Sequence, residues 1–216
     1  MCKALTMNSE LMKSYDIVAA FEHRVARRFG ARHGVAVDCC TNAIFLSLKY
    51  RQATGFAYDH ATIPARTYIS VPFALMHAGI RPRFSDYGWD SHYQLHPWLV
   101  YDCAKAWQDK PMLGTSGLYC LSFHGKKEIP IGRGGMIITN DGEAAAWLRK
   151  ARYDGREGVP FDQERIASVG WHMYMLPEQA ARGMTLMDLW PNGVDIAPEV
   201  YPDLREMPVF KVPHGA

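Results

Sequence analysis

The chain has 216 residues, 48% hydrophobic and 21% charged, which suits one globular domain or one domain with a small appendage. Its formal net charge of +2 is spread without a long run of one sign, so we expect no nucleic-acid partner. No stretch resembles a signal core or a membrane span, which predicts a cytoplasmic protein without membrane contact. The cysteines are odd in number and lack CxxC spacing, which argues against a disulfide framework and a zinc site: Cys2, Cys39, Cys40, Cys103 and Cys120.

Strands and helices alternate along most of the chain, which predicts an α/β fold with a largely parallel sheet. Helical spacing of apolar residues and turn signals predict helices at 14–29, 42–51, 68–77 and 141–155. Short apolar runs predict strands at 35–37, near Thr62, at 83–85, ending at Asp102, at 117–124 and at 134–140. Beyond Leu189 the periodicity is weak, and we expect loops with short strands there.

Four polar residues follow predicted strands at the edge where α/β sheets bind ligands: Thr41, Asp102, Ser122 and Lys127. They would supply an anion-binding turn at a helix start, a carboxylate, a hydroxyl and an amine. Such a set suits a cofactor that carries a phosphate, a protonatable ring nitrogen and an aldehyde, as pyridoxal phosphate does.

The order of several motifs resembles that of the DegT/DnrJ/StrS sugar aminotransferases, a family with the fold type I pyridoxal-phosphate architecture. The similar segments run from about Phe21 to Leu189 and are "FEHRVARRFGARHGVAVDCCTNAIFLSLKY", "IPARTYISVPFALMHAGIRPRFSDY", "VYDCAKAW", "CLSFHGKKEIPIGRGGMIITND" and "VGWHMYMLPEQAARGMTLMDL". The resemblance implies a three-layer α/β/α fold with a mostly parallel sheet.

The resemblance also assigns roles to individual residues. Counted from the shared "SFH", the Schiff-base lysine falls on Lys127 and not on Lys126, and Asp102 matches the aspartate that pairs with the pyridine nitrogen. Further residues match cofactor-binding positions: Cys40, Thr41 and Asn42 in the phosphate turn, Ser122 near the phosphate, and Tyr68 on the ring. Each of four residues also has a purely structural alternative: Lys127 could lie in a solvated turn, Asp102 could cap a turn, Thr41 could be a helix N-cap, and Tyr68 could be a core tyrosine.

The sequence departs from the family pattern in several places. "WLVYDCAK" follows "DSHYQLHP" at once, so a sheet element is expected to be missing near 97–98. Lys105 replaces a glutamine expected near the cofactor's phenolic oxygen, and His172 replaces an asparagine that reaches the partner subunit's phosphate. We expect a cofactor-binding domain over 1–189 and a reduced C-terminal tail over 190–216.

Three other motifs give weaker signals. His92 and His96 would share one helical face, but without the third ligand of a metal site. "GRGG" lacks the spacing of a dinucleotide site, and Cys39 and Cys40 lack a recognisable base that would make them nucleophiles. We expect no metal or dinucleotide site.

These features predict an aminotransferase that uses pyridoxal phosphate to move an amino group from an amino acid, glutamate or glutamine, to a ketosugar or similar small ketone. Two alternatives remain open: a related dehydratase or racemase, and a truncated, non-catalytic relative that binds cofactor or a partner in a regulatory or assembly role. The resemblance also implies a homodimer, in which Trp171, Met173 and Met175 would lack cover within their own chain.

Overall fold

The structure is a computed structural model that describes residues 7–211. The helices are α1 (Met7–Phe29), α2 (Cys40–Ala53), α3 (Ser70–His77), α4 (Gly142–Ala151), α5 (Pro177–Leu189) and α6 (Pro208–Lys211), with 3₁₀ turns η1 (Phe161–Gln163) and η2 (Leu204–Glu206). The strands are β1 (His33–Val37), β2 (His60–Pro64), β3 (Arg81–Ser85), β4 (Tyr93–Leu95), β5 (Val100–Asp102), β6 (Leu118–Ser122) and β7 (Gly135–Thr139).

The strands form a five-stranded sheet in the order β1-β7-β6-β5-β4 and a parallel pair, β2-β3. An antiparallel bridge between Thr62 and His96 places the pair next to β4. Strands β1, β2, β3, β5 and β6 therefore share one direction, while β4 and β7 run the other way. The expected common direction holds for five strands, but the sheet is mixed, and only β5-β6 and β2-β3 are parallel pairs.

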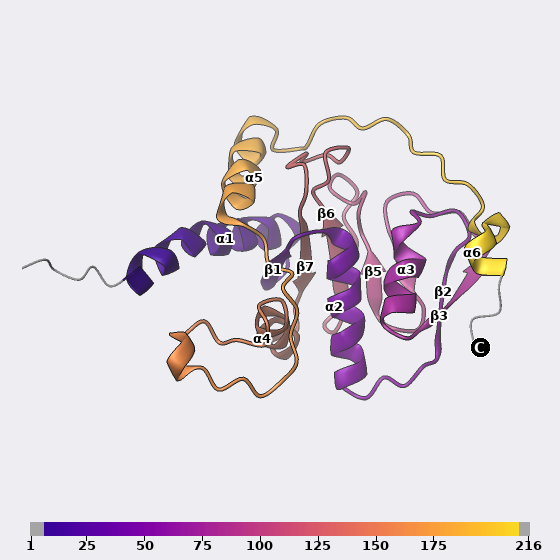
Figure 1. Cartoon of the computed structure of the whole chain (residues 1–216). Helices are drawn as coiled ribbons and strands as arrows, with labels where there is room; N and C mark the ends of the chain where they lie inside the picture. Colours follow the sequence, from indigo (N-terminus) through magenta and orange to yellow (C-terminus); the bar gives the residue numbers. More distant parts are fainter. Residues whose placement is uncertain (1–6, 212–216) are drawn as a thin grey trace, which may run out of the picture.

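Helices cover both faces of the large sheet, so the fold has three layers (Figure 1). Neighbouring residues of one strand enter opposite cores: Val35 and Val37 pack with α2, α3 and α4, whereas Ala36 packs with α1 and α5. This alternation explains why strands that are buried on both faces read as continuous apolar runs.

A buried carboxylate connects the two sides of the sheet. Glu22 of α1 accepts a hydrogen bond from the Ala36 backbone amide at 2.8 Å and pairs with Arg152, which follows α4. Arg152 also donates to the Ala36 carbonyl oxygen at 2.5 Å. Since Glu22 is only 5% exposed, loss of either charge would leave the other desolvated.

Most predicted elements are present with shifted ends, and four predictions need correction. Helix α1 begins well before residue 14, at Met7. Residues 92–96, which the histidine spacing placed on a helix, contain strand β4, and a short turn joins it to β5. Trp98 in that turn is fully buried, and its indole donates to the His60 carbonyl at 2.8 Å.

Residues 190–211, here named the strap, contain η2 and α6 and no strand, contrary to the expectation of short strands. The strap leaves α5 and runs across the top of the view in Figure 1 to reach α3 and β3. The expectation that Trp171 and Met175 lack cover within their own chain also needs correction. Met175 is fully buried, and Trp171 packs edge-on against Phe45.

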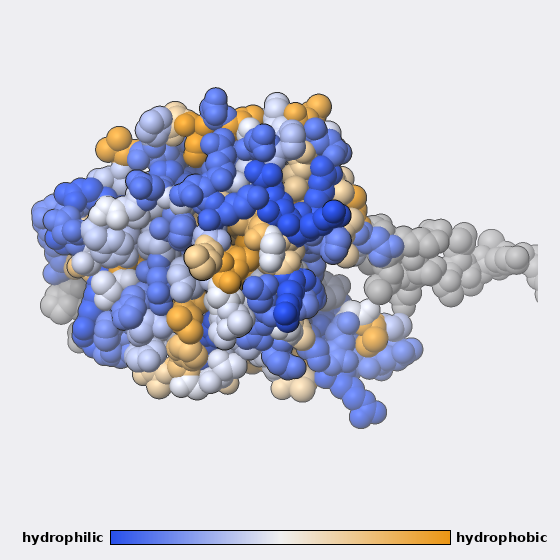
Figure 2. Space-filling model, turned by 180° about the vertical axis from the view of Figure 1, so that it is seen from behind, coloured by the Kyte–Doolittle hydropathy of each residue, from blue (hydrophilic) through white to orange (hydrophobic). Residues whose placement is uncertain are grey.

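The surface seen from behind is mostly hydrophilic, with apolar residues in small groups (Figure 2). Among the helices of residues 7–211, none combines the length and apolar character needed to cross a bilayer.

Candidate active site

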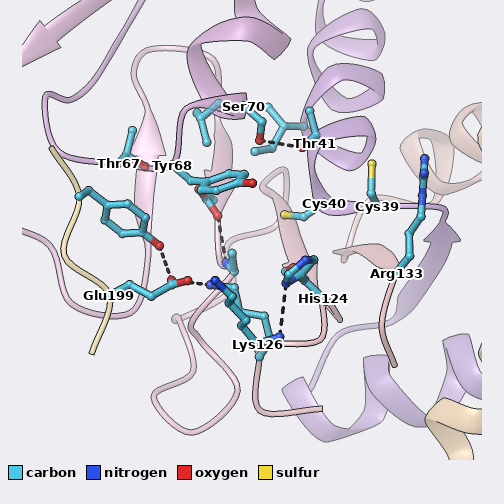
Figure 3. Close-up of a pocket in the computed structure, with 18 of the residues that line it drawn as sticks. Cys39, Cys40, Thr41, Thr67, Tyr68, Ser70, His124, Lys126, Arg133 and Glu199 are labelled. Carbon is cyan, nitrogen blue, oxygen red and sulfur yellow. Dashed lines mark hydrogen bonds and ion pairs between the residues drawn. The ribbon is translucent and has the colours of Figure 1, made fainter. Parts of the chain in front are cut away.

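A cavity of about 220 Å³ lies where α2 and α3 begin, at the carboxyl ends of β5 and β6 (Figure 3). Ligand sites of α/β sheets lie at such strand ends. The lining comes from several separate segments of the chain and comprises Cys39, Cys40, Thr41, Ile44, Thr67, Tyr68, Ser70, Val71, Trp89, Asp102, Ala104, Ser122, His124, Lys126, Lys127, Arg133, Gly134, Glu199 and Tyr201.

Lys127 sits in the turn that follows β6, where its backbone amide donates to the His124 carbonyl at 2.9 Å. Its side chain is 9% exposed and its amine donates to Glu199 Oε2 at 2.6 Å. The adjacent Lys126 is exposed, so the two lysines differ in environment. A buried amine with one carboxylate partner is a candidate for chemistry with carbonyl compounds.

Asp102 is the last residue of β5 and is buried. Its Oδ1 accepts from the Ala104 amide at 2.9 Å and its Oδ2 accepts from the Tyr93 hydroxyl at 2.9 Å. Thr67 lies 2.6 Å from the same hydroxyl; because that proton goes to the carboxylate, Thr67 donates to Tyr93. Burial raises the pKa of Asp102, an effect that these hydrogen bonds and the nearby Lys127 only partly oppose.

The start of α2 faces the same cavity. Its N-cap residue, Cys39, makes no side-chain hydrogen bond to the first amides of the helix, which leaves them available to an anion. Thr41 Oγ1 lies 2.7 Å from Ser70 Oγ of α3, so two hydroxyls stand beside these amides (Figure 3). Gly135 of β7 allows this placement, because a Cβ there would lie 2.4 Å from the Cys39 carbonyl carbon.

Tyr68 and Ser122 complete the predicted set that the cavity brings together. The Tyr68 ring is 58% exposed and projects over the cavity opposite Glu199 (Figure 3). It is therefore no core tyrosine. Ser122 lines the cavity at the end of β6, with a hydroxyl that accepts a long hydrogen bond of 3.4 Å from the His124 amide.

Three predicted residues lie outside the cavity. The side chain of Asn42 donates to Asp38 at 2.7 Å, which leaves only its backbone amide for the predicted role. Lys105 lies with its amine 5.0 Å from the centre of the Trp89 ring, in a neighbouring depression that Glu199 also lines. His172 is exposed and pairs with Asp154 at 2.8 Å, and its predicted contact with a partner subunit is not tested by one chain.

Cys39 and Cys40 line the cavity with neutral thiols. Burial raises the pKa of both, that of Cys40 well above its ordinary value, so neither has the thiolate character of a nucleophile. Cys2 lies outside the described residues.

Sequence reasoning missed the residues that contact the predicted ones. Tyr93 binds Asp102 directly, and Thr67 binds Tyr93. The position of Thr67 next to Tyr68 in the sequence was the signal that could have identified Thr67. Glu199 and Tyr201 come from the strap, whose weak periodicity gave no indication that it enters the site. Burial and the Glu199 carboxylate raise the pKa of Tyr201, which keeps its hydroxyl neutral as a donor to that carboxylate.

Comparison with known proteins identifies relatives that match most of this chain. The sequence model of the DegT/DnrJ/EryC1/StrS aminotransferase family matches residues 2–97 and 91–191. The chain is 25% identical to the spore coat polysaccharide biosynthesis protein SpsC of Bacillus subtilis, over 96% of this chain and 67% of that protein. It is 28% identical to the dTDP-3-amino-3,4,6-trideoxy-alpha-D-glucose transaminase of Micromonospora megalomicea, over 86% of this chain and 60% of that protein.

Solved structures share the fold. AtS13 from Actinomadura melliaura superposes with a TM-score of 0.70 at 18% identity and covers 85% of this chain and 64% of its own. The sugar aminotransferase CalS13 from Micromonospora echinospora gives 0.68 at 20% identity, over 80% and 60%. The chain thus spans about two thirds of the length of its relatives, and the predicted fold type I aminotransferase architecture is confirmed. Since the two matched segments together cover residues 2–191, the chain belongs to the DegT/DnrJ/EryC1/StrS aminotransferase family.

Proposed function

We propose that the cavity binds pyridoxal 5′-phosphate and that the chain forms the core of an aminotransferase acting on an amino acid donor and a ketosugar or similar small ketone. The observation that carries this proposal is the convergence of Lys127 and the buried Asp102 beside the start of α2. An amine, a carboxylate and an anion-binding helix start match the three polar parts of this cofactor.

The electrostatics of Asp102 support the fit. No ion pair to this carboxylate occurs within residues 7–211, although it is almost fully buried and its pKa is raised by burial. A buried carboxylate without a cation is costly, and a protonated pyridine nitrogen would supply the missing positive charge. Asp102 would in turn keep the proton on that ring nitrogen.

The opposite end of the cavity suits the phosphate. The first amides of α2 point to it without a side-chain cap, and the hydroxyls of Thr41 and Ser70 lie beside them. Both hydroxyls can donate to a phosphate oxygen. Arg133, whose guanidinium pairs with Asp38 at 2.7 Å, adds positive charge at the rim.

Pyridoxal phosphate, when bound, supplies a carbonyl carbon that condenses with amines and a ring that withdraws electrons. Lys127 would hold the cofactor through its amine and would afterwards carry the proton that leaves the α-carbon of the amino donor. Tyr68 would cover one face of the ring and so exclude water from it.

The substrate class is inferred from the relatives. A transaminase of a dTDP-linked amino sugar and a polysaccharide biosynthesis protein both match this chain over most of its length. We therefore infer an acceptor that is a ketosugar carried on a nucleotide, with glutamate or glutamine as the donor.

Reduction with borohydride tests the assignment of the lysine. The protein loaded with pyridoxal phosphate should acquire a stable cofactor adduct, and peptide mapping should place it on Lys127. Lys126→Arg serves as the matched control and should retain the adduct, whereas Lys127→Arg should abolish it. An adduct on Lys126 or Lys105, or none at saturating cofactor, would refute the proposed site.

A second candidate function is that of a cofactor-binding relative without turnover. It is favoured by the contact of Glu199 with Lys127, which engages the amine on which transamination depends. Addition of glutamate to the loaded protein separates the two functions, because only the aminotransferase converts the bound chromophore.

We also propose the domain organisation and the assembly expected from the sequence. The cofactor domain would span 1–189 with an element missing near 97–98, where the two family segments meet. In a homodimer, the exposed His172 would approach the partner's phosphate site. Sedimentation should give a dimer, and His172→Ala should weaken cofactor binding; a monomer with tight binding would refute the shared site.

A further inference from the structure

The strap lines one side of the cavity and is attached at both ends. At its beginning, the Val194 amide donates to the Glu128 carbonyl at 2.9 Å, one residue beyond Lys127. At its far end, the Leu204 amide donates to the Ala65 carbonyl at 2.9 Å. Between these two contacts the strap runs across the top of the view in Figure 1, and its residues Glu199 and Tyr201 line the cavity together with Lys127 and Tyr68.

Two side chains of the strap enter the cavity from this position. The Glu199 carboxylate binds the Lys127 amine at 2.6 Å and also accepts from the Tyr201 hydroxyl. The Tyr201 ring stacks on Trp89, with centroids 5.9 Å apart and planes inclined by 18°. The remaining volume, about 220 Å³, is below the ~300–1,000 Å³ that small-molecule sites usually offer.

The electrostatics of Glu199 indicate a true ion pair. Burial by itself would raise the pKa of this carboxyl, but the hydrogen bonds from Lys127 and Tyr201 hold it below its ordinary value. Lys105 also lowers it, and Lys127 has the same effect on the pKa of the nearby buried Asp102. The Glu199 carboxylate therefore occupies the Lys127 amine at 2.6 Å, where a carbonyl compound would have to approach.

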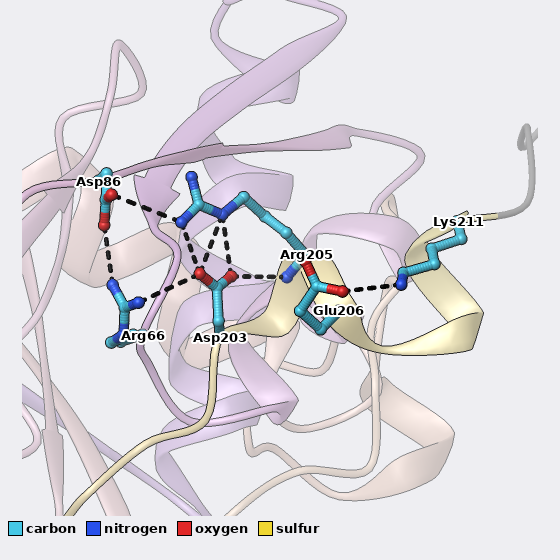
Figure 4. A network of polar contacts seen from close by, with 6 residues as sticks. All are labelled: Arg66, Asp86, Asp203, Arg205, Glu206 and Lys211. Carbon is cyan, nitrogen blue, oxygen red and sulfur yellow. Dashed lines mark hydrogen bonds and ion pairs between the residues drawn. The ribbon is translucent and has the colours of Figure 1, made fainter.

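A separate anchor fixes the far end of the strap on β2, β3 and α3 (Figure 4). Its ion pairs join Asp203 and Arg205 of the strap to Arg66 and Asp86, with Arg66–Asp86 at 2.8 Å and Arg66–Asp203 at 3.3 Å. These charges are largely exposed, so each pair contributes little. The apolar part of the anchor is Leu204, which is 1% exposed.

We propose that the strap is an intramolecular inhibitor of the cofactor site, in which Glu199 occupies the Lys127 amine and has to withdraw before a carbonyl compound reaches it. This inference rests on the proposed cofactor function. A carbonyl carbon bonded to the Lys127 nitrogen would take the position next to that atom which Glu199 Oε2 holds at 2.6 Å, so Glu199 would have to move away. The strap and the loaded cofactor therefore exclude each other.

Acylation of the cofactor-free protein by acetic anhydride tests the contact without any cofactor. Peptide mass spectrometry would give the labelling rate of Lys127 relative to the exposed Lys126, which serves as an internal reference. In Glu199→Gln this ratio should rise by roughly tenfold, because the amine loses its charged partner. Glu206→Gln is the matched control on the same segment, since the Glu206 carboxylate pairs with Lys211 and not with any residue that lines the cavity, and it should leave the ratio unchanged.

A second variant reaches the same state by another route. Leu204→Ser should release the anchor and raise the Lys127 ratio even with Glu199 present. An unchanged labelling ratio in Glu199→Gln would overturn the proposal. So would an unchanged ratio in Leu204→Ser, provided that faster hydrogen exchange around position 204 shows that the anchor is released.

Hydrogen exchange with pyridoxal phosphate then separates this inference from the proposed function. Loading should speed exchange at the Leu204 amide and leave the core Ala36 amide unchanged. A loaded protein whose strap stays protected would overturn the inhibitor while leaving the cofactor site intact. If no variant binds the cofactor, the proposed function fails, and the acylation ratio alone decides whether the strap blocks the amine.

Discussion

Replacement of Asp102 by Asn gives opposite expectations for the empty and the loaded protein. In the empty protein the carboxylate is almost fully buried and makes no ion pair within residues 7–211, and burial outweighs the nearby Lys127 in its effect on the pKa, so removal of the charge relieves a desolvation cost. An asparagine can keep both contacts: its oxygen accepts from the Ala104 amide, and its NH₂ donates to Tyr93, whose proton turns toward Thr67. The free energy of unfolding at pH 7 should therefore change by less than about 1 kcal/mol.

Binding of pyridoxal phosphate should respond much more strongly to the same substitution. The charged hydrogen bond between Asp102 and the ring nitrogen would be lost, and such bonds contribute about 1.5–3 kcal/mol. This corresponds to a dissociation constant raised roughly 10- to 150-fold. The rate of amino transfer from glutamate should fall further, since the ring no longer keeps its proton.

Absorbance titration with the cofactor and urea unfolding measure the two quantities on the same preparations. Asp162→Asn, at an exposed position in η1, is the matched control and should change neither. A dissociation constant within about twofold of that of the original chain would show that Asp102 does not face the ring nitrogen. Because the folded pKa of Asp102 is raised, the original chain should also lose stability relative to Asp102→Asn as the pH rises above about 4.

Three further substitutions or conditions test the framework around the cavity. Glu22→Ala leaves Arg152 without its carboxylate in a partly buried position and should destabilise the protein by about 3–5 kcal/mol in urea unfolding, unless the pair is unformed. Gly135→Ala places a Cβ 2.4 Å from the backbone before α2, so it should cost about 1–3 kcal/mol and weaken cofactor binding; normal binding would contradict the close approach. Arg205 lowers the pKa of Asp203 to about 2, so the ion pairs of the anchor should be complete above about pH 4 and be lost toward pH 2. Hydrogen exchange of the strap would detect this loss, and release of the strap at a higher pH would contradict the prediction.

The sequence predicted the elements that carry a strong local pattern. The buried strands ending at Asp102 and Ser122 stand out as apolar runs, and a polar residue directly after such a run lies at the ligand-binding edge. This is why six predicted residues meet in one cavity. The direction of β4 was not predictable in this way, because three residues carry too little periodicity and their orientation follows from the short turn into β5.

The strap shows the limit of local patterns more clearly. Only Leu204 is buried in the second half of the strap, and two of its ion pairs, Arg66–Asp203 and Arg205–Asp86, join residues more than 100 positions apart in the chain. Neither helical nor strand spacing is needed to hold such a segment, so no local pattern indicates that Glu199 lies beside Lys127. A related limit applies to long side chains: a motif position specifies where the Lys105 backbone lies, but not that its amine lies over the Trp89 ring.

The charges in the cavity connect the proposed cofactor with the strap. Lys127 is the buried cation between Asp102 and Glu199, so the empty site has one more negative charge than positive charge among these three groups. A ligand that brings a cationic ring to Asp102 would pair that carboxylate, and its carbonyl carbon, once bonded to Lys127, would displace Glu199 from that nitrogen. The phosphate of the ligand would add further negative charge close by, which the amides of α2 and the side chains of Arg133 and Lys126 oppose. Release of Glu199 to solvent removes the one carboxylate that the loaded site does not use, so the same electrostatic balance that favours the cofactor disfavours the strap.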